Sequence, residues 1–522
     1  MKKLGIMAVT MMLIGTSVFA QTFTLKSKEL GGQFTNKQYL NGMGYTGENQ
    51  SPQLYWENPP CGTKSFAVTM YDLDAPTGSG FWHWVVFNIP ANVNELKSGA
   101  GDVNKDLMPV GAIQSNTDMG VPGYAGIAPT EGAPHRYLIT VYAVDKMLDL
   151  DRNATPAYVC FNLHYSTLGK ASLLIYGQKT STPPLTLIAK NEKYVWNGAV
   201  ISPKGRLFAS MPCWLGPTPG VVEIMADGSF KPYPGGEWNQ WQRDKDPLKS
   251  FVDVNSIFID KNNHMWVNDA AAPDFGKAIP GAVKVVEIDL NTNKVIRNIV
   301  FDPKVVGADT RLAHIRIWKN YAILAESKSG SFIIIDLKDN SYRRILTGNK
   351  DFMLCQPEEV PLIEGRLMKF ASGKNMYINN DLVELDEANG TLYFMCLFGT
   401  KMFKINVEDL TNPLLEEKDI LQKISVAYDF KGSWVAGVCR DEKGNFYFTD
   451  AVNNGVKKMD KNGYFSTIVT DNEIIWPIAP SIDKNGVLYF TSSQLNRFPL
   501  LNNNKNTVER PWKMWKINVP NY

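Results

Sequence analysis

The chain has 522 residues, of which 44% are hydrophobic and 20% charged, so it is long and apolar enough to form more than one folded domain. Its 54 basic residues nearly balance its 52 acidic ones, and the formal net charge is +2. No run of lysine and arginine is long enough to neutralise a phosphate backbone, which argues against a nucleic-acid partner.

The N-terminus starts with two lysines, continues as an apolar run from Leu4 to Ile14 and ends in small residues at Ala20. These zones, in this order, predict a secretory signal peptide over 1–20. The apolar run is short for a membrane anchor, and no cysteine follows the cut to carry a lipid. We therefore expect an exported protein, periplasmic or extracellular, with no integral membrane segment once the signal is removed.

Six cysteines are spread over the chain, and none has the CxxC spacing of many metal sites: Cys61, Cys160, Cys213, Cys355, Cys396 and Cys439. An exported protein allows disulfides, but six thiols permit about fifteen complete pairings, so the sequence predicts no particular disulfide. It also predicts no metal and no other cofactor.

A stretch of small polar residues and a proline pair near Pro184 interrupts regular structure and predicts a linker over 180–186. The linker would separate an N-terminal domain over 21–179 from a C-terminal one over 187–522. In the first domain, short β-branched and aromatic runs bounded by Gly, Pro and Asn are typical of the strands of a β-sandwich. They cover 66–71, 82–89 and 137–144.

After the linker, a turn containing Asp, Asn or Gly repeatedly leads into an aromatic strand, and a second strand type follows. The turn and strand recur at 202–208, 260–267, 318–324, 386–394, 441–448 and 483–490. A spacing of about forty to seventy residues is typical of propeller blades with insertions, so an all-β fold with a six-bladed β-propeller is expected. The run 185–189 is positioned to close the ring by pairing with 512–517.

Three short polar islands hold two carboxylates, two of the five histidines, an arginine and a tyrosine: Tyr71 to Pro76, Trp82 to Trp84 and Gly132 to Tyr137. Their spacing is too irregular for one amphipathic face, so we interpret them as one pocket. They resemble the phosphatidylethanolamine-binding protein family, in its bacterial Raf-kinase-inhibitor-like branch, whose members hold small anions in a surface cup. The resemblance covers only the first third of the chain.

Imidazole and phenol groups donate to anions, and a carboxylate beside a histidine commonly fixes its tautomer. The resemblance implies that four residues line the cup: Asp72, His83, His135 and Tyr137. Asp72 is expected to accept a hydrogen bond from an imidazole. No serine or cysteine lies in a recognisable nucleophile context, so we predict binding of a phosphate- or carboxylate-type anion and assign no catalytic residue.

Arg136 adjoins His135 in a predicted strand, so the two side chains should point to opposite faces. We expect Arg136 to form a structural salt bridge with Asp74, because a guanidinium matches a carboxylate in two places. The family's usual Asp-Pro-Asp is changed here by Leu73, which loosens the turn but keeps both carboxylates.

The second region resembles the major royal jelly and yellow proteins over nearly all of Leu185 to Tyr522. Five stretches in the same order carry the resemblance: Gly205 to Trp214, Tyr233 to Asn239, Met265 to Asp269, Gly444 to Asp450 and Leu488 to Phe498. Relatives in the yellow family are linked to dopachrome conversion and biogenic amine binding. The resemblance therefore implies a small organic ligand, and Asp381 is placed to pair with a cationic one.

Propellers commonly bind ligands at one end of the central channel, on residues of the innermost strands. The channel candidates are Asn197, Asn255, His314 and Asp381. Calcium-dependent lactonase propellers, distant relatives of the yellow family, need converging oxygen ligands, and here Ala436 stands where an aspartate is expected. For the nearby tryptophans, such as Trp214, we favour core packing over a ligand platform.

Two hypotheses remain open. The first is an exported two-domain binding protein with an anion pocket in the sandwich and an organic ligand in the propeller channel. The alternative is a propeller enzyme, either a dopachrome-type isomerase or a lactonase-like hydrolase. We favour the first hypothesis, because the hard-oxygen cage that a calcium-dependent lactonase needs is depleted in this sequence.

Overall fold

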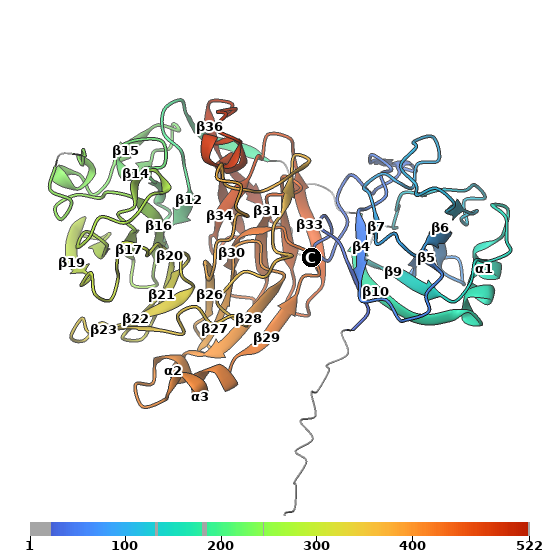
Figure 1. Cartoon of the computed structure of the whole chain (residues 1–522). Coiled ribbons are helices and arrows are strands. Elements are labelled where there is room, and N and C mark those ends of the chain that lie inside the picture. Colours follow the sequence, from blue (N-terminus) through green and yellow to red (C-terminus); the bar gives the residue numbers. More distant parts are fainter. Residues whose placement is uncertain (1–21, 131–133, 180–184, 244, 520–522) are drawn as a thin grey trace, which may run out of the picture.

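The computed structural model describes residues 22–130, 134–179, 185–243 and 245–519. Strands predominate, and the chain forms two lobes that lie side by side (Figure 1). The expected signal peptide over 1–20 and residues 180–184 of the expected linker lie outside the described residues. Within the described part of the chain, no helix combines the length and apolar character needed to span a bilayer.

The N-terminal lobe contains two main antiparallel sheets. The larger has the strand order β10 (Thr167–Gly177), β9 (His135–Val144), β5 (Ser65–Asp72), β6 (Phe81–Pro90) and β8 (Ile113–Gln114). The smaller has the order β1 (Thr24–Lys26), β4 (Leu54–Glu57) and β7 (Glu95–Leu96). A short hairpin joins β2 (Asn41–Gly42) and β3 (Tyr45–Thr46).

Apolar side chains from both sheets form one core. Leu25 and Trp56 contribute from the smaller sheet, and Val68, Ile139 and Val141 from the larger. The three strands predicted from β-branched and aromatic runs lie within β5, β6 and β9. The sequence prediction of these strands is therefore confirmed, because their side chains are the ones that cover the core.

The C-terminal lobe contains six antiparallel sheets of four strands each. Five consist of consecutive strands: β12 (Gly198–Ile201), β13 (Leu207–Met211), β14 (Gly220–Ile224) and β15 (Phe230–Pro232); β16 (Val254–Ile259), β17 (His264–Asp269), β18 (Lys284–Asp289) and β19 (Lys294–Val300); β20 (Leu312–Trp318), β21 (Tyr321–Glu326), β22 (Ser331–Asp336) and β23 (Tyr342–Ile345); β26 (Leu382–Asp386), β27 (Thr391–Met395), β28 (Lys401–Asn406) and β29 (Ser425–Asp429); β30 (Val435–Arg440), β31 (Phe446–Asp450), β32 (Gly455–Met459) and β33 (Phe465–Thr470).

The sixth sheet combines the two ends of the lobe. Its order is β11 (Thr186–Asn191), β36 (Trp512–Asn518), β35 (Val487–Ser492) and β34 (Pro477–Ile482). β11 pairs antiparallel with β36, with Thr186 opposite Lys516 and Asn191 opposite Trp512. The strand begins at the end of the expected linker and lies beside the last strand of the chain.

Each turn motif found in the sequence connects the first two strands of a sheet, as between β16 and β17 at 260–263. Each sheet has one innermost strand, which is β34 in the sixth sheet and the first strand in chain order in the other five; we call these six the first strands. They contact one another in the succession β12, β16, β20, β26, β30, β34 and again β12. Such an arrangement of small sheets around shared first strands is propeller-like, because each sheet covers an apolar face of its neighbour.

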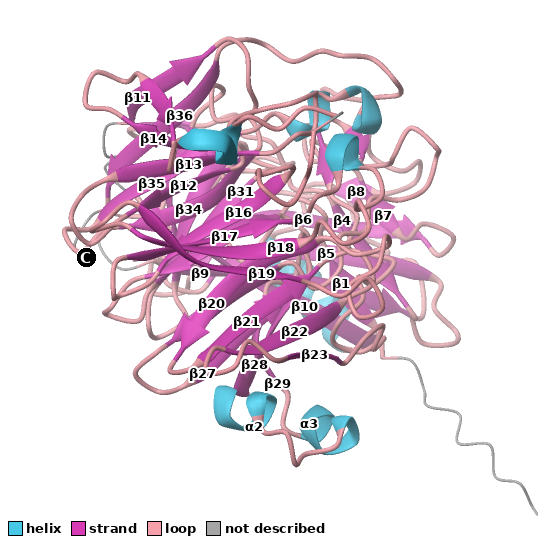
Figure 2. Cartoon of the chain, turned by 90° about the vertical axis from the view of Figure 1, so that its left-hand side faces the viewer, coloured by secondary structure: helices cyan, strands magenta, loops and turns pink. Residues whose placement is uncertain are grey.

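Short helices depart from the all-β expectation. α1 (Pro156–His164) begins where Thr155 accepts a hydrogen bond from the Tyr158 backbone N–H at 3.3 Å, with a proline in its first turn. α2 (Val407–Thr411) and α3 (Glu417–Gln422) form an insertion between β28 and β29 that protrudes from the lobe (Figure 2). A small hairpin, β24 (Leu362–Ile363) and β25 (Arg366–Leu367), precedes β26.

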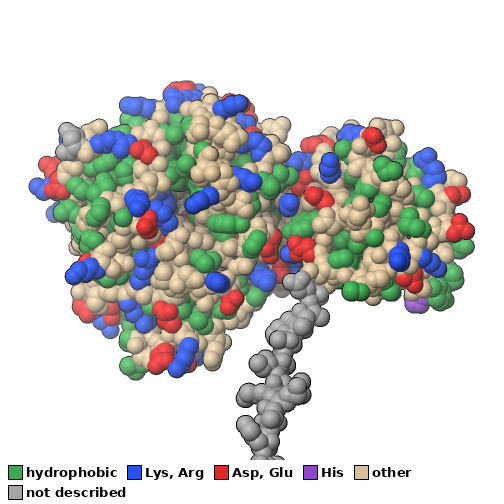
Figure 3. All heavy atoms as spheres, in the orientation of Figure 1, with side chains coloured by type: hydrophobic (Ala, Val, Ile, Leu, Met, Phe, Trp, Pro, Cys, Tyr) green, Lys and Arg blue, Asp and Glu red, His purple; other side chains and the backbone are tan. Residues whose placement is uncertain are grey.

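The two lobes pack through the segment that follows β1. The backbone at Gly31 lies so close to Trp434 that a Cβ there would come within 1.4 Å of the indole nitrogen. Asn453 Nδ2 donates to the Glu29 carbonyl at 3.4 Å, and Lys26 pairs with Glu358 at 3.5 Å. β10 also contacts β33 at this junction. Figure 3 shows basic and acidic side chains interspersed over both lobes on the face in view.

Candidate ligand-binding sites

Three neighbouring strands of the larger N-terminal sheet carry the four residues expected to line the cup. Asp72 ends β5, His83 lies in β6, and His135 and Tyr137 lie in β9. All four side chains are buried. Tyr137 is directly opposite Asp72 across the β5–β9 pair, so the sheet register itself brings the residues together.

The centre of the cup is a histidine held by a carboxylate. His135 Nδ1 lies 2.9 Å from Asp72 Oδ2, and its Nε2 lies 3.2 Å from the Thr130 hydroxyl. The other Asp72 oxygen accepts from the Asp74 backbone N–H at 2.9 Å. Asp72 therefore fixes the orientation of the imidazole, and each of its two carboxylate oxygens accepts one hydrogen bond.

The Tyr137 ring lies between the two histidines. Ring centroids are 5.4 Å apart for His83 and Tyr137 and 6.4 Å apart for His135 and Tyr137. Among the described residues, the buried Tyr137 hydroxyl has no hydrogen-bond partner. Burial and the negative charge of Asp72 raise the pKa of Tyr137, so its hydroxyl keeps its proton and stays a donor.

His83 is held by a backbone carbonyl and not by a carboxylate. Its Nδ1 donates to the Ala125 carbonyl at 2.9 Å, because a carbonyl oxygen only accepts. Burial lowers the pKa of His83, which favours the neutral ring with an unprotonated Nε2. His83 becomes a second donor only when it takes up a proton.

Arg136 points away from the cup, as the strand alternation predicts. His135 and Tyr137 are buried and Arg136 between them is exposed. Its guanidinium contacts both oxygens of Asp74, Nη2 to Oδ1 at 2.7 Å and Nε to Oδ2 at 2.9 Å. This bidentate contact lowers the pKa of Asp74. The turn after β5 is thus tied to β9, with Leu73 exposed within it.

In the C-terminal lobe, a cavity of about 370 Å³ lies at one end of the ring of first strands, and we call it the central cavity. All four channel candidates line it: Asn197, Asn255, His314 and Asp381. Ile478 also lines it, whereas Ala436 is not among its lining residues. A second cavity of about 190 Å³ shares Asn255 and His314, so these two side chains lie between the two spaces.

His314 and Asp381 form the titratable pair of the central cavity. His314 Nδ1 donates to the Asp381 carbonyl oxygen at 2.9 Å and lies 3.9 Å from the carboxylate Oδ2. Burial lowers the pKa of His314 to about 4 and raises that of Asp381 to about 7. Near neutral pH the imidazole is therefore uncharged with a free Nε2, and the carboxyl is divided between its two forms.

The asparagines of the cavity floor are fixed by backbone groups. Asn197 Nδ2 donates to the Asn255 carbonyl at 2.5 Å, and Asn255 Nδ2 donates to the Leu312 carbonyl at 3.0 Å. Among the described residues the Asn197 side-chain oxygen has no partner. Asp381 is the single carboxylate among the residues that line the central cavity, which is few for a calcium site built from hard oxygen ligands.

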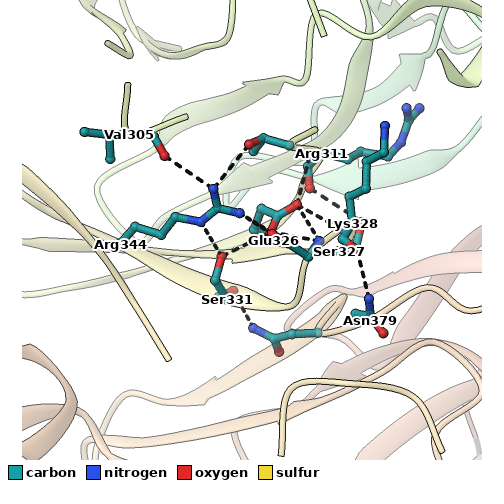
Figure 4. Close-up of polar contacts among 11 residues, drawn as sticks. Val305, Arg311, Glu326, Ser327, Lys328, Ser331, Arg344 and Asn379 are labelled. Atoms are coloured by element: carbon teal, nitrogen blue, oxygen red, sulfur yellow. Dashed lines mark hydrogen bonds and ion pairs between the residues drawn. The ribbon is translucent and has the colours of Figure 1, made fainter. Parts of the chain in front are cut away.

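A buried ion pair holds the polar rim of the central cavity (Figure 4). Arg344 Nη2 lies 2.6 Å from Glu326 Oε2, and Glu326 Oε1 accepts from the backbone N–H groups of Arg311 at 3.0 Å and Lys328 at 2.8 Å. Glu326 is fully buried. Glu326 thus fixes the backbone of two residues that line the cavity, whereas the Arg311 guanidinium itself pairs with Asp253 at 3.0 Å and the Lys328 ammonium with Asp309 at 3.4 Å.

The walls of the central cavity are largely apolar, and several of their residues, such as Phe275 and Phe370, carry no signal in the sequence. Trp214 packs on Phe275 with ring centroids 4.6 Å apart, and the Arg311 guanidinium lies 4.8 Å from the Phe275 ring centroid. Phe370 also lines the cavity from a loop, and Leu500 from the short 3-10 helix Pro499–Leu501. Trp214, interpreted from sequence as a core residue, thus faces the cavity as well, since burial in a core and in a cavity wall give the same sequence pattern.

Comparison with known protein families gives two separate matches along the chain. The phosphatidylethanolamine-binding protein family matches residues 31–177, and the major royal jelly protein family matches residues 252–521, which is more than half of the chain. The first match contains all four cup residues. The second contains Asn255, His314 and Asp381 but begins after Asn197.

Individual relatives show the same division. The chain is 49% identical to YbhB of Escherichia coli over 144 residues, 27% of this chain and 90% of that protein. It is 20% identical to major royal jelly protein 3 of Apis mellifera over 202 residues, 37% of this chain and 34% of that one. The crystal structure of Escherichia coli YbcL covers 30% of this chain and 99% of its own, with 40% identity and a TM-score of 0.30.

Proposed function

This chain belongs to the phosphatidylethanolamine-binding protein family in its N-terminal region and to the major royal jelly protein family in its C-terminal region. From this premise, we propose that it is an exported protein that binds two small ligands. One is a phosphate- or carboxylate-type anion in the cup. The other is an organic molecule in the central cavity. The signal-like segment 1–20 supports export.

The observation that carries the anion proposal is the donor set around Tyr137. Its hydroxyl is buried and protonated beside the Asp72 carboxylate, whose oxygens already accept from His135 and from Asp74, and no described residue forms a hydrogen bond with it. A buried donor without a partner costs about 1–3 kcal/mol, which an oxyanion would recover by accepting from it. His135 stands beside it, with Nδ1 held by Asp72 and Nε2 3.2 Å from the Thr130 hydroxyl, so the doubly protonated ring would offer its Nε2–H to an anion in place of that hydroxyl. These groups suit a small oxyanion.

Two features of the central cavity support an organic ligand: its volume, and the separation of its apolar walls from its polar floor. About 370 Å³ falls within the range of about 300–1,000 Å³ that small-molecule pockets occupy. Aromatic and aliphatic walls such as Trp214 and Phe370 suit an apolar body, and His314 and Asp381 on the floor suit a polar head. We take the frame to be a six-bladed propeller over 187–522, closed by β11, following a sandwich domain over 21–179.

A second candidate function is catalysis in the same cavity, as an isomerase or a hydrolase of a small cyclic substrate. It is favoured by one observation, the presence of a neutral imidazole beside a carboxyl whose pKa is about 7. Such a pair can take up and release protons near neutral pH. Asn197 and Asn255 could orient a substrate carbonyl between them.

The test is calorimetric titration of the full chain with inorganic phosphate and, separately, with tyramine as an aromatic amine. Saturable heat in both titrations supports the proposal, and absence of heat with phosphate contradicts the anion part. Assays with dopachrome and a panel of lactones, with and without calcium, test the catalytic candidate. Turnover that is lost in His314→Gln would replace binding by catalysis as the function of the C-terminal lobe.

A further inference from the structure

Beside the central cavity, but not among its lining residues, two thiols and a carboxylate converge from separate parts of the C-terminal lobe. Cys355 and Glu359 lie on the loop after β23, and Cys396 directly follows β27. Their potential ligand atoms all lie within 4.8 Å of one another. Cys396 and Glu359 are buried and Cys355 is half-buried. We call these three residues the thiol cluster.

The carboxylate of the thiol cluster has no cationic partner. Among the described residues, no lysine, arginine or histidine forms a salt bridge with Glu359, although its side chain is buried. It accepts instead from the Thr400 N–H at 2.7 Å, the Thr400 hydroxyl at 2.9 Å and the Gln356 N–H at 2.8 Å. Buried carboxylates are normally paired with a cation or coordinate a metal ion. A metal ion would supply the cationic partner that Glu359 lacks among the described residues.

We propose that Cys355, Glu359 and Cys396 bind a divalent zinc-like metal ion. A tetrahedral zinc site with two thiolates and one carboxylate places its ligand atoms about 3.5–3.8 Å apart, which agrees with the mutual closeness of the three side chains. Three protein ligands leave a fourth position, and the half-buried side of Cys355 gives water access to it. The Thr400 and Gln356 hydrogen bonds hold the carboxylate in place as outer partners.

Binding at the thiol cluster releases protons. Zinc is held by thiolates rather than by thiols, so each cysteine that binds the ion gives up its proton. Two thiols would lose their protons as two metal–sulfur bonds form, and both protons go to solvent. Apparent zinc affinity should therefore rise with pH.

The position of the thiol cluster gives the ion a structural role next to the proposed ligand site. Leu397, adjacent to Cys396, lines the central cavity, and Glu358, adjacent to Glu359, pairs with Lys26 of the N-terminal lobe. An ion here would fasten the loop after β23 to the end of β27. It would thereby stiffen one wall of the cavity and one contact between the lobes.

The experiment uses the full chain, reduced and stripped of metal, titrated with zinc against a chromophoric chelator and with cobalt as a spectroscopic probe. We expect one zinc per chain, a thiolate-to-cobalt charge-transfer band, release of about two protons per ion and a higher Tm with zinc. Affinity should fall by more than about tenfold in Cys355→Ser and in Glu359→Gln. Cys61→Ser, which removes an exposed thiol in the N-terminal lobe, is the matched control and should bind as the wild type does.

Three results would overturn the proposal: no stoichiometric zinc binding, zinc binding that survives both substitutions, or a Cys355–Cys396 disulfide in the chain before reduction. Circular dichroism of each metal-free variant separates loss of a ligand from loss of the fold. Cys355→Ser is the decisive variant, because its side chain is half-buried and serine fits the space that the thiol leaves.

Discussion

The cup and the central cavity use polar side chains in opposite ways. In the cup, His135 is held 2.9 Å from Asp72, and the Tyr137 hydroxyl is left as a donor. In the cavity, burial is the largest influence on the groups, lowering the pKa of His314 to about 4 and raising that of Asp381 to about 7. Donors fixed by a charged partner suit an oxyanion, whereas uncharged groups within apolar walls suit an organic molecule.

The largest loss of stability is expected on removal of the buried Glu326 carboxylate at the rim of the central cavity. Glu326→Gln leaves Arg344 without its carboxylate and should destabilise the C-terminal lobe by about 3–5 kcal/mol, because breaking a buried pair strands a charge. Urea denaturation followed by tryptophan fluorescence measures the loss. Glu408→Gln, in an exposed pair with Lys319, is the control and should change the free energy of unfolding by less than about 1 kcal/mol. Equal effects of the two substitutions would contradict the role given to Glu326.

The next effect is a pH dependence of stability that the paired groups of the central cavity produce. Between about pH 4 and 7 the folded Asp381 keeps a proton that the unfolded chain has lost, so its contribution to stability falls by about 4 kcal/mol as pH rises. Over about pH 4 to 6.5 the unfolded His314 is protonated and the folded one is not, so its contribution rises by about 3 kcal/mol. The two slopes nearly cancel in the wild type.

Single substitutions should expose these opposed slopes. Asp381→Asn should gain stability with rising pH between 4 and 6.5 relative to the wild type, and His314→Gln should lose stability as pH rises to 7. Chemical denaturation at several pH values follows both. Parallel pH profiles for the two variants would contradict the assigned protonation states.

A smaller effect concerns the donors of the cup. His135→Ala removes the imidazole that Asp72 orients and should weaken phosphate binding by at least about tenfold, since hydrogen bonds to charged groups contribute about 1.5–3 kcal/mol. His164→Ala, on the exposed end of α1, is the matched histidine control and should leave phosphate affinity unchanged. Calorimetry gives both values. An unchanged phosphate affinity in His135→Ala would contradict the proposal that the cup binds the anion.

The smallest effect is expected for the ion pair on the opposite face of β9. Arg136→Ala breaks the bidentate contact with Asp74, but the pair is exposed and does not reach the cup. Phosphate affinity should change by less than about threefold, because exposed ion pairs contribute little. A larger loss in the same calorimetric titration would mean that Arg136 contacts the anion or sets the position of Asp72.

The sequence predicted what depends on local pattern. Runs of β-branched and aromatic residues located β5, β6 and β9, and strand alternation placed Arg136 opposite His135. The recurring turns gave the start of each four-stranded sheet, and with it the positions of His314 and Asp381. What the sequence could not give depends on contacts between distant segments.

Three features illustrate that limit. The walls of the central cavity come partly from loops, such as the one with Phe370, which carry no hydrophobic period. The pair of Glu326 and Arg344 joins two different strands and leaves no motif. Cys355 and Cys396 lie far apart along the chain, so their closeness follows only from the packing of two neighbouring sheets. The short helices α2 and α3 form an insertion that the repeat pattern does not contain.

The central claim is that the cup and the central cavity bind their ligands independently. The most direct test is a calorimetric titration of phosphate, and separately of tyramine, into the wild type, His135→Ala and Asp381→Asn. We expect His135→Ala to lose phosphate and keep tyramine, and Asp381→Asn to keep phosphate and lose tyramine. If either substitution abolishes both heats, or if neither changes the heat of its own ligand, the assignment of the two sites is wrong.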